Sequence, residues 1–340
     1  MIDAGIAVYT RAVSMLIFFS VFLVGCVPTA RPLVSVRRVY DAPLLSAGPA
    51  VEVAAAGDIA CDPNDSNYNG GSGTNHRCHM QATSDLLLSL HPAAVLTMGD
   101  NQYQRGALEA FRESYDSTWG RLKAITHPTV GNHEYWTPQA AGYFAYFGSA
   151  AGLPGKGYYS FDLGGWHIVA LNSICHHVGG CGFNSPQEQW LREDLRVHHG
   201  ECLLAYWHHP RFSSGITGSH RAYTAFWQDL YQAGADVVLG GHDHHYERFA
   251  PQDSQGRPDP PRGIREFVVG TGGKGGFSGF YRFLPFGGRR NPNSEARNSG
   301  TFGVLVLTLH PAGYAWSFVA EPGKTFRDSG TGLCHAFASP

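Results

Sequence analysis

Short apolar runs bounded by glycine and polar residues recur along the chain from Val51 onwards. Val51–Ala56, Ala93–Met98 and Val237–Leu239 are examples, and all three are rich in valine, leucine or alanine. Runs of this length and composition are typical of strands that are buried on both faces. The pattern predicts strands at 51–58, 94–99, 158–163, 166–172, 202–208, 235–240, 264–270, 302–309 and 313–320.

Longer segments between these runs carry apolar residues at helical spacing. Ser185 followed by Pro186 supplies an N-cap with proline at the first helical position. Strands and helices alternate through the middle of the chain, whereas the part from Ile264 onwards is nearly all strand and turn. This order favours an α/β fold of two packed mixed sheets flanked by helices, with loops gathered at one rim. The predicted helices are 79–91, 107–123, 138–147, 186–199 and 222–233.

The first fifty residues differ in composition from the rest. Residues 12–24 form an apolar run about as long as the core of a signal peptide, and shorter than the roughly 20 residues that span a bilayer. The run ends in Leu23-Val24-Gly25-Cys26, which resembles a bacterial lipobox with Cys26 as the lipidated residue. A signal peptide with a chance cysteine and a buried N-terminal helix are the alternatives. We expect a signal peptide over 1–25, a tether over 26–50 rich in Pro, Val, Ala and Ser, and one domain over 51–340.

Cysteine usage agrees with export. Beyond Cys26 there are six cysteines, and an even number in an extracytoplasmic chain indicates disulfides. Sequence alone leaves the connectivity open, although proximity favours Cys61–Cys78, Cys175–Cys181 and, by elimination, Cys202–Cys334. A cysteine metal site is disfavoured, because no Cys-x-x-Cys pair occurs and ligand-type His and Asp are plentiful.

The net charge is −2 and only 15% of the residues are charged. This balance lacks the basic surface of a nucleic-acid-binding protein, so no nucleic-acid partner is expected. Attraction of an anionic substrate must then be local, from metal ions and nearby His or Arg. The oligomeric state is left open.

Carboxylate, phenol, amide and imidazole side chains stand at or just beyond the ends of the predicted strands. Such donors suit Fe, Zn or Mn rather than a thiolate-bound metal. We expect two metal ions, with Asp100 as the bridging carboxylate. His242 and His244 are two residues apart, so on a regular strand they would share a face and reach neighbouring metals. The predicted ligands are Asp58, Tyr103 and His244 for one ion, and Asn132, His208 and His242 for the other.

Other histidines are interpreted differently. His133 beside Asn132 is left to act on substrate, and His209 is expected either to lie directly behind the ligands or to face solvent. His198 and His199 end a predicted helix, where the helix dipole favours positive charge without any further role.

The ordered set of Asp58, Gly99-Asp100-Asn101-Gln102-Tyr103, Gly131-Asn132-His133-Glu134, His208-His209-Pro210 and Gly241-His242-Asp243-His244 resembles the calcineurin-like metallophosphoesterase superfamily. Tyr103, three residues after Asp100, and His-Tyr-Glu-Arg at 245–248 resemble the purple acid phosphatases, in their compact single-domain form. The resemblance spans roughly 51–335.

The resemblance implies a four-layer α/β/β/α sandwich. It also implies Fe(III) at Asp58, Asp100, Tyr103 and His244, and Fe, Zn or Mn at Asp100, Asn132, His208 and His242. Metal-bound hydroxide would attack phosphorus, His133 would assist the leaving group, and His220 would contact phosphate.

Three functions are consistent with the sequence. The first is a phosphate monoesterase held outside the cytoplasm, on the membrane through a lipid anchor or secreted. The second is a phosphodiesterase acting on cyclic nucleotides or phospholipid head groups, which the presence of Tyr103 disfavours. The third is a surface binding lipoprotein that retains the fold without turnover, which the complete ligand set disfavours.

Overall fold

The computed structural model describes residues 49–276 and 290–335. Nearly all of the predicted signal peptide and tether (1–25 and 26–50) lies outside the described residues, so these two assignments stay predictions. Within the described ranges, no helix is long and apolar enough to span a membrane.

The first sheet has six strands in the order β13-β12-β11-β1-β2-β3. Strands β1, β2 and β3 are parallel to one another, and β11 joins the other side of β1 in antiparallel register. The strands are β1 (Val51–Ala56), β2 (Ala94–Met98), β3 (Thr126–Thr129), β11 (Gly303–His310), β12 (Gly313–Ala320) and β13 (Asp328–Leu333).

The second sheet has seven strands in the order β10-β8-β9-β7-β6-β5-β4. Its centre is parallel, from β5 through β6 and β7 to β9, whereas β4, β8 and β10 pair antiparallel with their neighbours. The strands are β4 (Tyr159–Leu163), β5 (Trp166–Ala170), β6 (Cys202–Tyr206), β7 (Val237–Gly240), β8 (Tyr246–Phe249), β9 (Arg265–Val269) and β10 (Ser294–Asn298).

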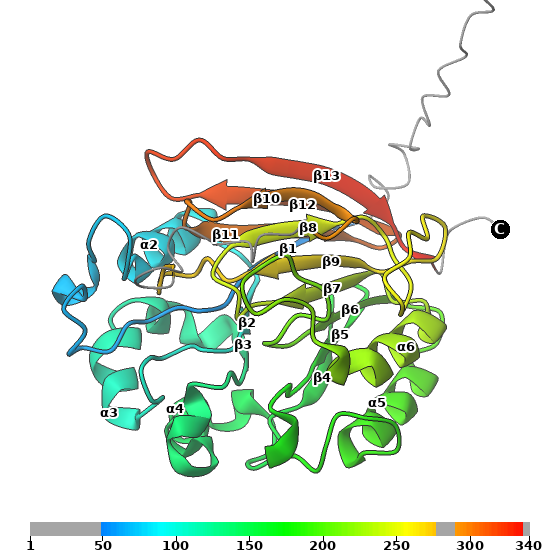
Figure 1. The fold of residues 1–340 in the computed structure, drawn as a ribbon, viewed down its shortest axis with the longest axis horizontal. Coiled ribbons are helices and arrows are strands. Elements are labelled where there is room, and N and C mark those ends of the chain that lie inside the picture. The colour runs from blue at the N-terminus through cyan, green and yellow to red at the C-terminus, as the bar shows by residue number, and fades with distance from the viewer. Residues whose placement is uncertain (1–48, 277–289, 336–340) are drawn as a thin grey trace, which may run out of the picture. The chain divides into compact units, whose positions relative to one another are not determined.

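Alternate residues of the second sheet face two different cores. On β5, Ile168 packs with residues of the first sheet such as Leu96 and Leu305, whereas Val169 packs with Leu191 and Phe226 of the covering helices. Helices α2, α3 and α4 lie to one side of the paired sheets and α5 and α6 to the other (Figure 1). The predicted arrangement of two mixed sheets flanked by helices is therefore confirmed. The helices are α2 (Met80–Leu90), α3 (Leu108–Ala110), α4 (Ala141–Phe147), α5 (Pro186–Val197) and α6 (Thr224–Ala233).

Four strands were missed, and three of them are edge strands. β3, β10 and β13 each end a sheet. Their sequences are polar or rich in glycine, and β3 contains Pro128, which an edge strand tolerates because one side of it needs no ladder hydrogen bonds. The fourth, β8, directly follows the histidines at 242–245 and was read only as a motif. All nine predicted strands are present, with ends shifted by a few residues.

The single helix predicted over 107–123 is wrong. The segment instead contains the three-residue α3, a π-helical turn over Phe111–Tyr115 and a 3-10 helix over Trp119–Ile125. Ser117 and Thr118 donate their hydroxyl hydrogens to the backbone carbonyl of Ser114. Such local side-chain bonds compete with the regular helical ladder, which explains the interruption.

Three disulfides have the predicted pairing. Cys61–Cys78, Cys175–Cys181 and Cys202–Cys334 have Cα separations of 5.5, 5.1 and 5.4 Å. These distances are typical of native bridges. The last bond joins the start of β6 to the segment after β13, 132 residues apart in the chain.

Candidate metal centre

The predicted ligands converge at one rim of the two sheets. Parallel strands bring their carboxyl ends to a common edge, where α/β folds place their sites. Each strand end is followed within a few residues by one or two ligand-type side chains, and all of these side chains are mostly or fully buried. They follow β1 (Asp58), β2 (Asp100 and Tyr103), β3 (Asn132), β6 (His208) and β7 (His242 and His244).

Three of these residues have left-handed backbone conformations. The φ angles of Asp58, Asp100 and His242 are 60°, 47° and 67°. This region is unfavourable for residues other than glycine and is concentrated at functional sites. His242 and His244 therefore lie on a turn between β7 and β8, and the interpretation that they share one face of a regular strand is wrong. Both nevertheless reach the site.

The hydroxyl of Tyr103 lies at the centre of one group of ligand atoms. It is 2.9 Å from Oδ1 of Asp58, 2.9 Å from Oδ2 of Asp100 and 3.0 Å from Nε2 of His244. Nδ1 of His244 donates to the carbonyl oxygen of Gly275, so Nε2 is the ring nitrogen that faces the site, 3.2 Å from Oδ1 of Asp58. A phenol, two carboxylate oxygens and an imidazole nitrogen thus converge, which is an arrangement that a bound cation would satisfy.

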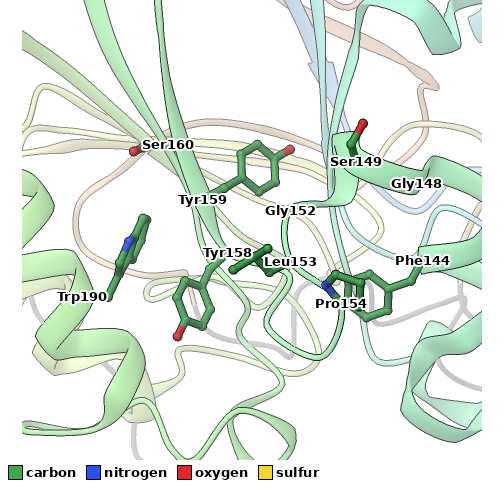
Figure 2. A pocket seen from close by; sticks show the side chains of 10 residues that line it. All are labelled: Phe144, Gly148, Ser149, Gly152, Leu153, Pro154, Tyr158, Tyr159, Ser160 and Trp190. Atoms are coloured by element: carbon green, nitrogen blue, oxygen red, sulfur yellow. The ribbon is translucent and has the colours of Figure 1, made fainter.

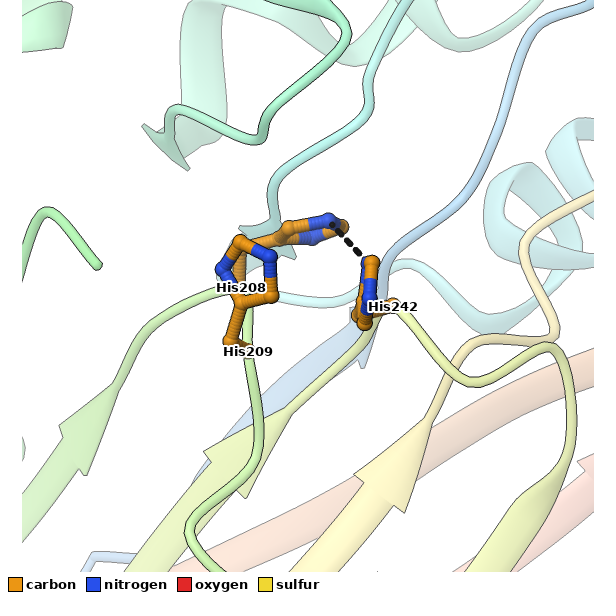
Figure 3. A group of neighbouring side chains, drawn as sticks. All are labelled: His208, His209 and His242. Carbon is orange, nitrogen blue, oxygen red and sulfur yellow. Dashed lines mark hydrogen bonds between the residues drawn. The ribbon is translucent and has the colours of Figure 1, made fainter. Parts of the chain in front are cut away.

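A second group surrounds His208. Its Nδ1 donates to the carbonyl of Met98 at 2.7 Å, so Nε2 is the ring nitrogen that faces the site. This nitrogen is 3.0 Å from Oδ1 of Asn132, 3.2 Å from Nδ1 of His242 and 3.4 Å from Oδ2 of Asp100. Figure 3 shows the rings of His208 and His242 turned toward each other, with His209 beside them. Four atoms that could bind a metal ion again lie close together.

Oδ2 of Asp100 belongs to both groups. Separations of 2.9 to 3.4 Å between ligand atoms match two donors that each bond one ion at about 2.0–2.2 Å. The residues present therefore fit two cations that share Asp100, as the sequence predicts.

Burial and neighbouring charged groups shift the pKa values of the side chains in the site. Burial opposes charge on His208, yet Asp100 raises the pKa of His208 to about 9. Burial and the neighbouring His208 lower the pKa of His242 to about 3, which keeps that imidazole neutral as a ligand must be. Burial together with Asp100 and Asp58 holds the pKa of Tyr103 well above its usual value, so ionisation of this phenol requires a cation.

His133 lies beside the first group without joining it. Its backbone N–H donates to Oδ1 of Asp100 at 2.9 Å, and its ring packs on that of Tyr103 with centroids 4.3 Å apart. Nδ1 is 2.7 Å from the carbonyl oxygen of Gln104 and donates to it, which leaves Nε2 directed at the site, 3.8 Å from Oδ2 of Asp100. His133 therefore lies beside the predicted ligands with its Nε2 facing them.

His220 and His209 lie beside the second group. Their ring centroids are 5.8 and 4.2 Å from that of His242. Nε2 of His220 is buried and has no hydrogen-bond partner among the residues that the structure describes. Nδ1 of His209 is 3.0 Å from the hydroxyl of Ser173. His209 therefore lies against the predicted ligand His242.

Glu134 organises the site, although the sequence assigned it no role. Its buried carboxylate accepts backbone N–H groups from Asp100, Gln102 and Gly131, at 3.1, 3.1 and 2.7 Å. Burial and the nearby Asp100 raise its pKa to about 8, and the N–H donors act in the opposite direction. Glu134 thereby joins the loops after β2 and β3. The only sequence signal for a role of Glu134 was its position at the end of the Gly-Asn-His-Glu motif.

Lys274 lies against the ring of Tyr103. Its ammonium group is 4.9 Å from the ring centroid and 2.8 Å from Oδ2 of Asp65, and the side chain is buried. Nothing in its spacing predicted this contact.

A cavity of about 570 Å³ lies elsewhere, against α4, β4 and α5. Phe144, Leu153, Tyr158 and Trp190 supply much of its apolar wall (Figure 2). None of the predicted ligands lines it. The chemistry expected of the chain therefore belongs to the strand-end rim and not to this cavity.

The two-sheet fold and the cluster of oxygen and imidazole donors define a class of α/β protein with a candidate metal centre at its strand-end rim. The chain belongs to the calcineurin-like phosphoesterase family, whose model matches residues 53–246. Purple acid phosphatase 23 of Arabidopsis thaliana is 32% identical to it over 207 residues, which cover 49% of this chain and 44% of that protein. The chain thus spans less than half the length of this curated relative.

Two solved structures share the fold. The purple acid phosphatase PPD1 from yellow lupin (Lupinus luteus) seeds has a TM-score of 0.66 at 17% identity, over 84% of this chain and 54% of that one. GAP50, described as the anchor in the inner membrane complex of Plasmodium, has a TM-score of 0.55 at 14% identity, over 84% of this chain and 89% of that one. Since one of these is described as an anchor, activity must be argued from the site.

Proposed function

We propose that this chain hydrolyses phosphate monoesters with a dinuclear metal centre, outside the cytoplasm. The observation that carries the proposal is the position of Oδ2 of Asp100, 2.9 Å from the Tyr103 hydroxyl and 3.4 Å from Nε2 of His208. One carboxylate oxygen thus belongs to two separate groups of atoms that could bind a metal ion.

In this proposal the two ions differ. Fe(III) binds Asp58, Asp100, Tyr103 and His244, and Fe, Zn or Mn binds Asp100, Asn132, His208 and His242. The buried phenol of Tyr103, surrounded by two carboxylates and an imidazole, supports a trivalent ion on its side, because a high charge favours loss of the phenol proton. The neutral amide and two imidazoles on the other side suit a divalent ion.

The bound ions would supply a nucleophile at moderate pH and electrostatic stabilisation of the phosphoryl oxygens. His133 protonates the leaving oxygen through Nε2, and the carbonyl of Gln104 fixes the orientation of its ring. His220 contacts the phosphate through its unpartnered Nε2. Glu134 keeps the loops that carry Asp100 and Asn132 in register.

The location is part of the same proposal. Three disulfides suit an oxidising compartment. Lipidation at Cys26 would attach the domain to a membrane, and cleavage without lipidation would release it.

Comparison of a monoester with a diester tests the proposal. We expect purified, metal-loaded protein to hydrolyse p-nitrophenyl phosphate with a kcat/KM at least about tenfold above that for bis(p-nitrophenyl) phosphate, which corresponds to about 1.4 kcal/mol of transition-state preference. Preference for the diester would assign the chain to phosphodiesterases. Absence of turnover in protein that holds two metal ions would instead support the binding lipoprotein.

A further inference from the structure

A second group of ligand-type side chains lies at the opposite rim of the seven-stranded sheet. Asp162 on β4 pairs directly across the hairpin with His167 near the start of β5. His198 caps the carboxyl end of α5, and Glu201 immediately precedes β6. The metal centre stands at the carboxyl ends of the parallel strands, whereas this group stands at their amino ends. The two groups share no residue.

The geometry of this group suits one small cation. One ligand atom from each of the four side chains lies within 4.8 Å of the ligand atoms of the others. Nδ1 of His167 is 2.7 Å from Oδ1 of Asp162, and Nδ1 of His198 is 4.0 Å from that oxygen and 3.3 Å from Oε1 of Glu201. A tetrahedral zinc ion with bonds of about 2.0–2.2 Å separates its ligand atoms by about 3.4 Å. The observed distances lie on both sides of this value.

An outer carboxylate orients the innermost ligand. Nε2 of His167 is 2.8 Å from Oδ2 of Asp194, whose other oxygen accepts the hydroxyl of Ser160 at 2.7 Å. A histidine that binds a metal commonly donates its second ring N–H to a carboxylate in this way. Donation from Nε2 to Asp194 would leave the lone pair of a neutral His167 ring at Nδ1, on the side of Asp162.

The two imidazole rings lie side by side at this group. The rings of His167 and His198 are stacked, with centroids 3.5 Å apart and planes 10° apart. Because the nitrogen lone pairs lie in the ring planes, an ion held by both rings requires the partly exposed His198 ring to turn toward His167. The end of α5 adds the negative end of a helix dipole. His167 is 1% exposed, whereas the Asp162, His198 and Glu201 side chains are 64%, 23% and 42% exposed, so the site opens to solvent.

We propose that Asp162, His167, His198 and Glu201 bind one Zn²⁺ ion, with Asp194 as the positioning residue behind His167. Two imidazoles and two carboxylates are a donor set that zinc accepts, and the four side chains leave no ligand-free position in a tetrahedral site. The role is structural. The ion would tie the β4–β5 hairpin, which forms one edge of the sheet, to the end of α5 and the start of β6.

Zinc stoichiometry in matched histidine variants tests this site. His199 is the neighbour of His198, is exposed and is outside the group, so His199→Ala is the control for His198→Ala. Each full-length variant is equilibrated with Zn²⁺, passed through a desalting column and analysed for metal and protein content. We expect wild type and His199→Ala to hold one more zinc per chain than His198→Ala, whatever the occupancy of the dinuclear centre.

Two further variants separate metal loss from misfolding. Glu201→Gln keeps the size of an exposed side chain and should also lose the additional zinc. Asp194→Asn should retain the site with about 10–100-fold weaker affinity in a chelator competition. For each variant, the unfolding temperature is compared between a sample with excess Zn²⁺ and a sample with chelator. The increase caused by Zn²⁺ should be larger for His199→Ala than for His198→Ala. Equal zinc content in wild type, His198→Ala and Glu201→Gln would overturn the proposal.

Discussion

The hydroxyl of Tyr103 lies 2.9 Å from Oδ2 of Asp100, and the two residues are three positions apart on the loop after β2. This loop therefore supplies both the shared carboxylate and the phenol of the candidate metal centre. Because Glu134 holds the loop through the backbone N–H groups of Asp100 and Gln102, the position of the phenol depends on a carboxylate from the next loop.

Removal of the shared carboxylate should affect both ions. We expect Asp100→Ala to lower the metal content at both positions and to reduce phosphatase activity to background, whereas loss of a ligand to one ion need not displace the other. Metal analysis alongside the activity assay checks this. The control is Asp85→Ala, because the side chain of Asp85 is 56% exposed, lies on α2 and is not among the predicted ligands. An Asp100→Ala protein that keeps two ions would contradict the bridging role.

His133 should act in turnover and not in metal binding. We expect His133→Ala to retain both ions and to lower kcat by roughly 10²–10⁴, the usual effect of removing a general acid or base. The absence of any contact closer than 3.8 Å between its Nε2 and Asp100 is the basis for this separation. Substitution of the exposed His199 serves as the control. Loss of stoichiometric metal in His133→Ala would show that the residue is a ligand.

Glu134 should be a structural requirement of the site. Glu134→Gln replaces a carboxylate that accepts three backbone N–H groups by an amide with one acceptor oxygen and an NH₂ group that faces donors. We expect a loss of about 2–4 kcal/mol in the free energy of unfolding, from buried donors left without partners, together with weaker metal binding. Chemical denaturation of the metal-free protein measures the first effect and metal titration the second. An unchanged free energy of unfolding together with unchanged metal binding would show that Glu134 does not hold the two loops.

Stability should depend on pH through Asp229 on α6. Burial and the adjacent Glu188 carboxyl of α5 raise the pKa of Asp229 to about 7. The folded state thus binds a proton that the unfolded chain releases near pH 4, so this contribution to stability is complete below pH 4 and is lost as the pH rises through 7.

Asp229→Asn removes this titration while keeping a hydrogen-bond donor toward Glu188. We expect the unfolding free energy of the variant relative to wild type to rise by about 1–2 kcal/mol between pH 4 and pH 8. Thermal denaturation across that range tests it, with the exposed Asp85→Asn as the control. A difference between variant and wild type that stays constant with pH would show that the two carboxyl groups share no proton.

The buried strands were predictable because both faces of β1, β2, β6 and β7 are covered, which produces continuous apolar runs. The edge strands β3, β10 and β13 were not, since an edge strand keeps one side in solvent and carries polar residues or glycine. The interruption of the helix predicted over 107–123 depends on side-chain to backbone bonds at Ser117 and Thr118, and periodicity does not report such bonds.

The ligand-type residues of the site were visible in the sequence because they follow strand ends at fixed motifs. The left-handed turn at His242 was not visible in the sequence, and it occurs where a regular strand was expected. Contacts between segments that are far apart in the chain could not be predicted from the sequence either. Lys274 meets Asp65 and the ring of Tyr103, and His167 meets Asp194 and His198. These pairs have no common spacing, and only the folded chain brings them together.

The central claim is that Tyr103 and the shared Asp100 hold two ions, one of them Fe(III). A phenolate bound to Fe(III) absorbs visible light, whereas Zn(II), with a filled d shell, does not. The most direct measurement is the metal content and visible spectrum of purified wild type beside Tyr103→Phe. We predict two ions per chain at the strand-end rim, at least one of them iron, and a visible band that disappears in Tyr103→Phe while iron remains bound. A colourless wild type that holds only Zn or Mn, or a band unchanged in Tyr103→Phe, would contradict this account.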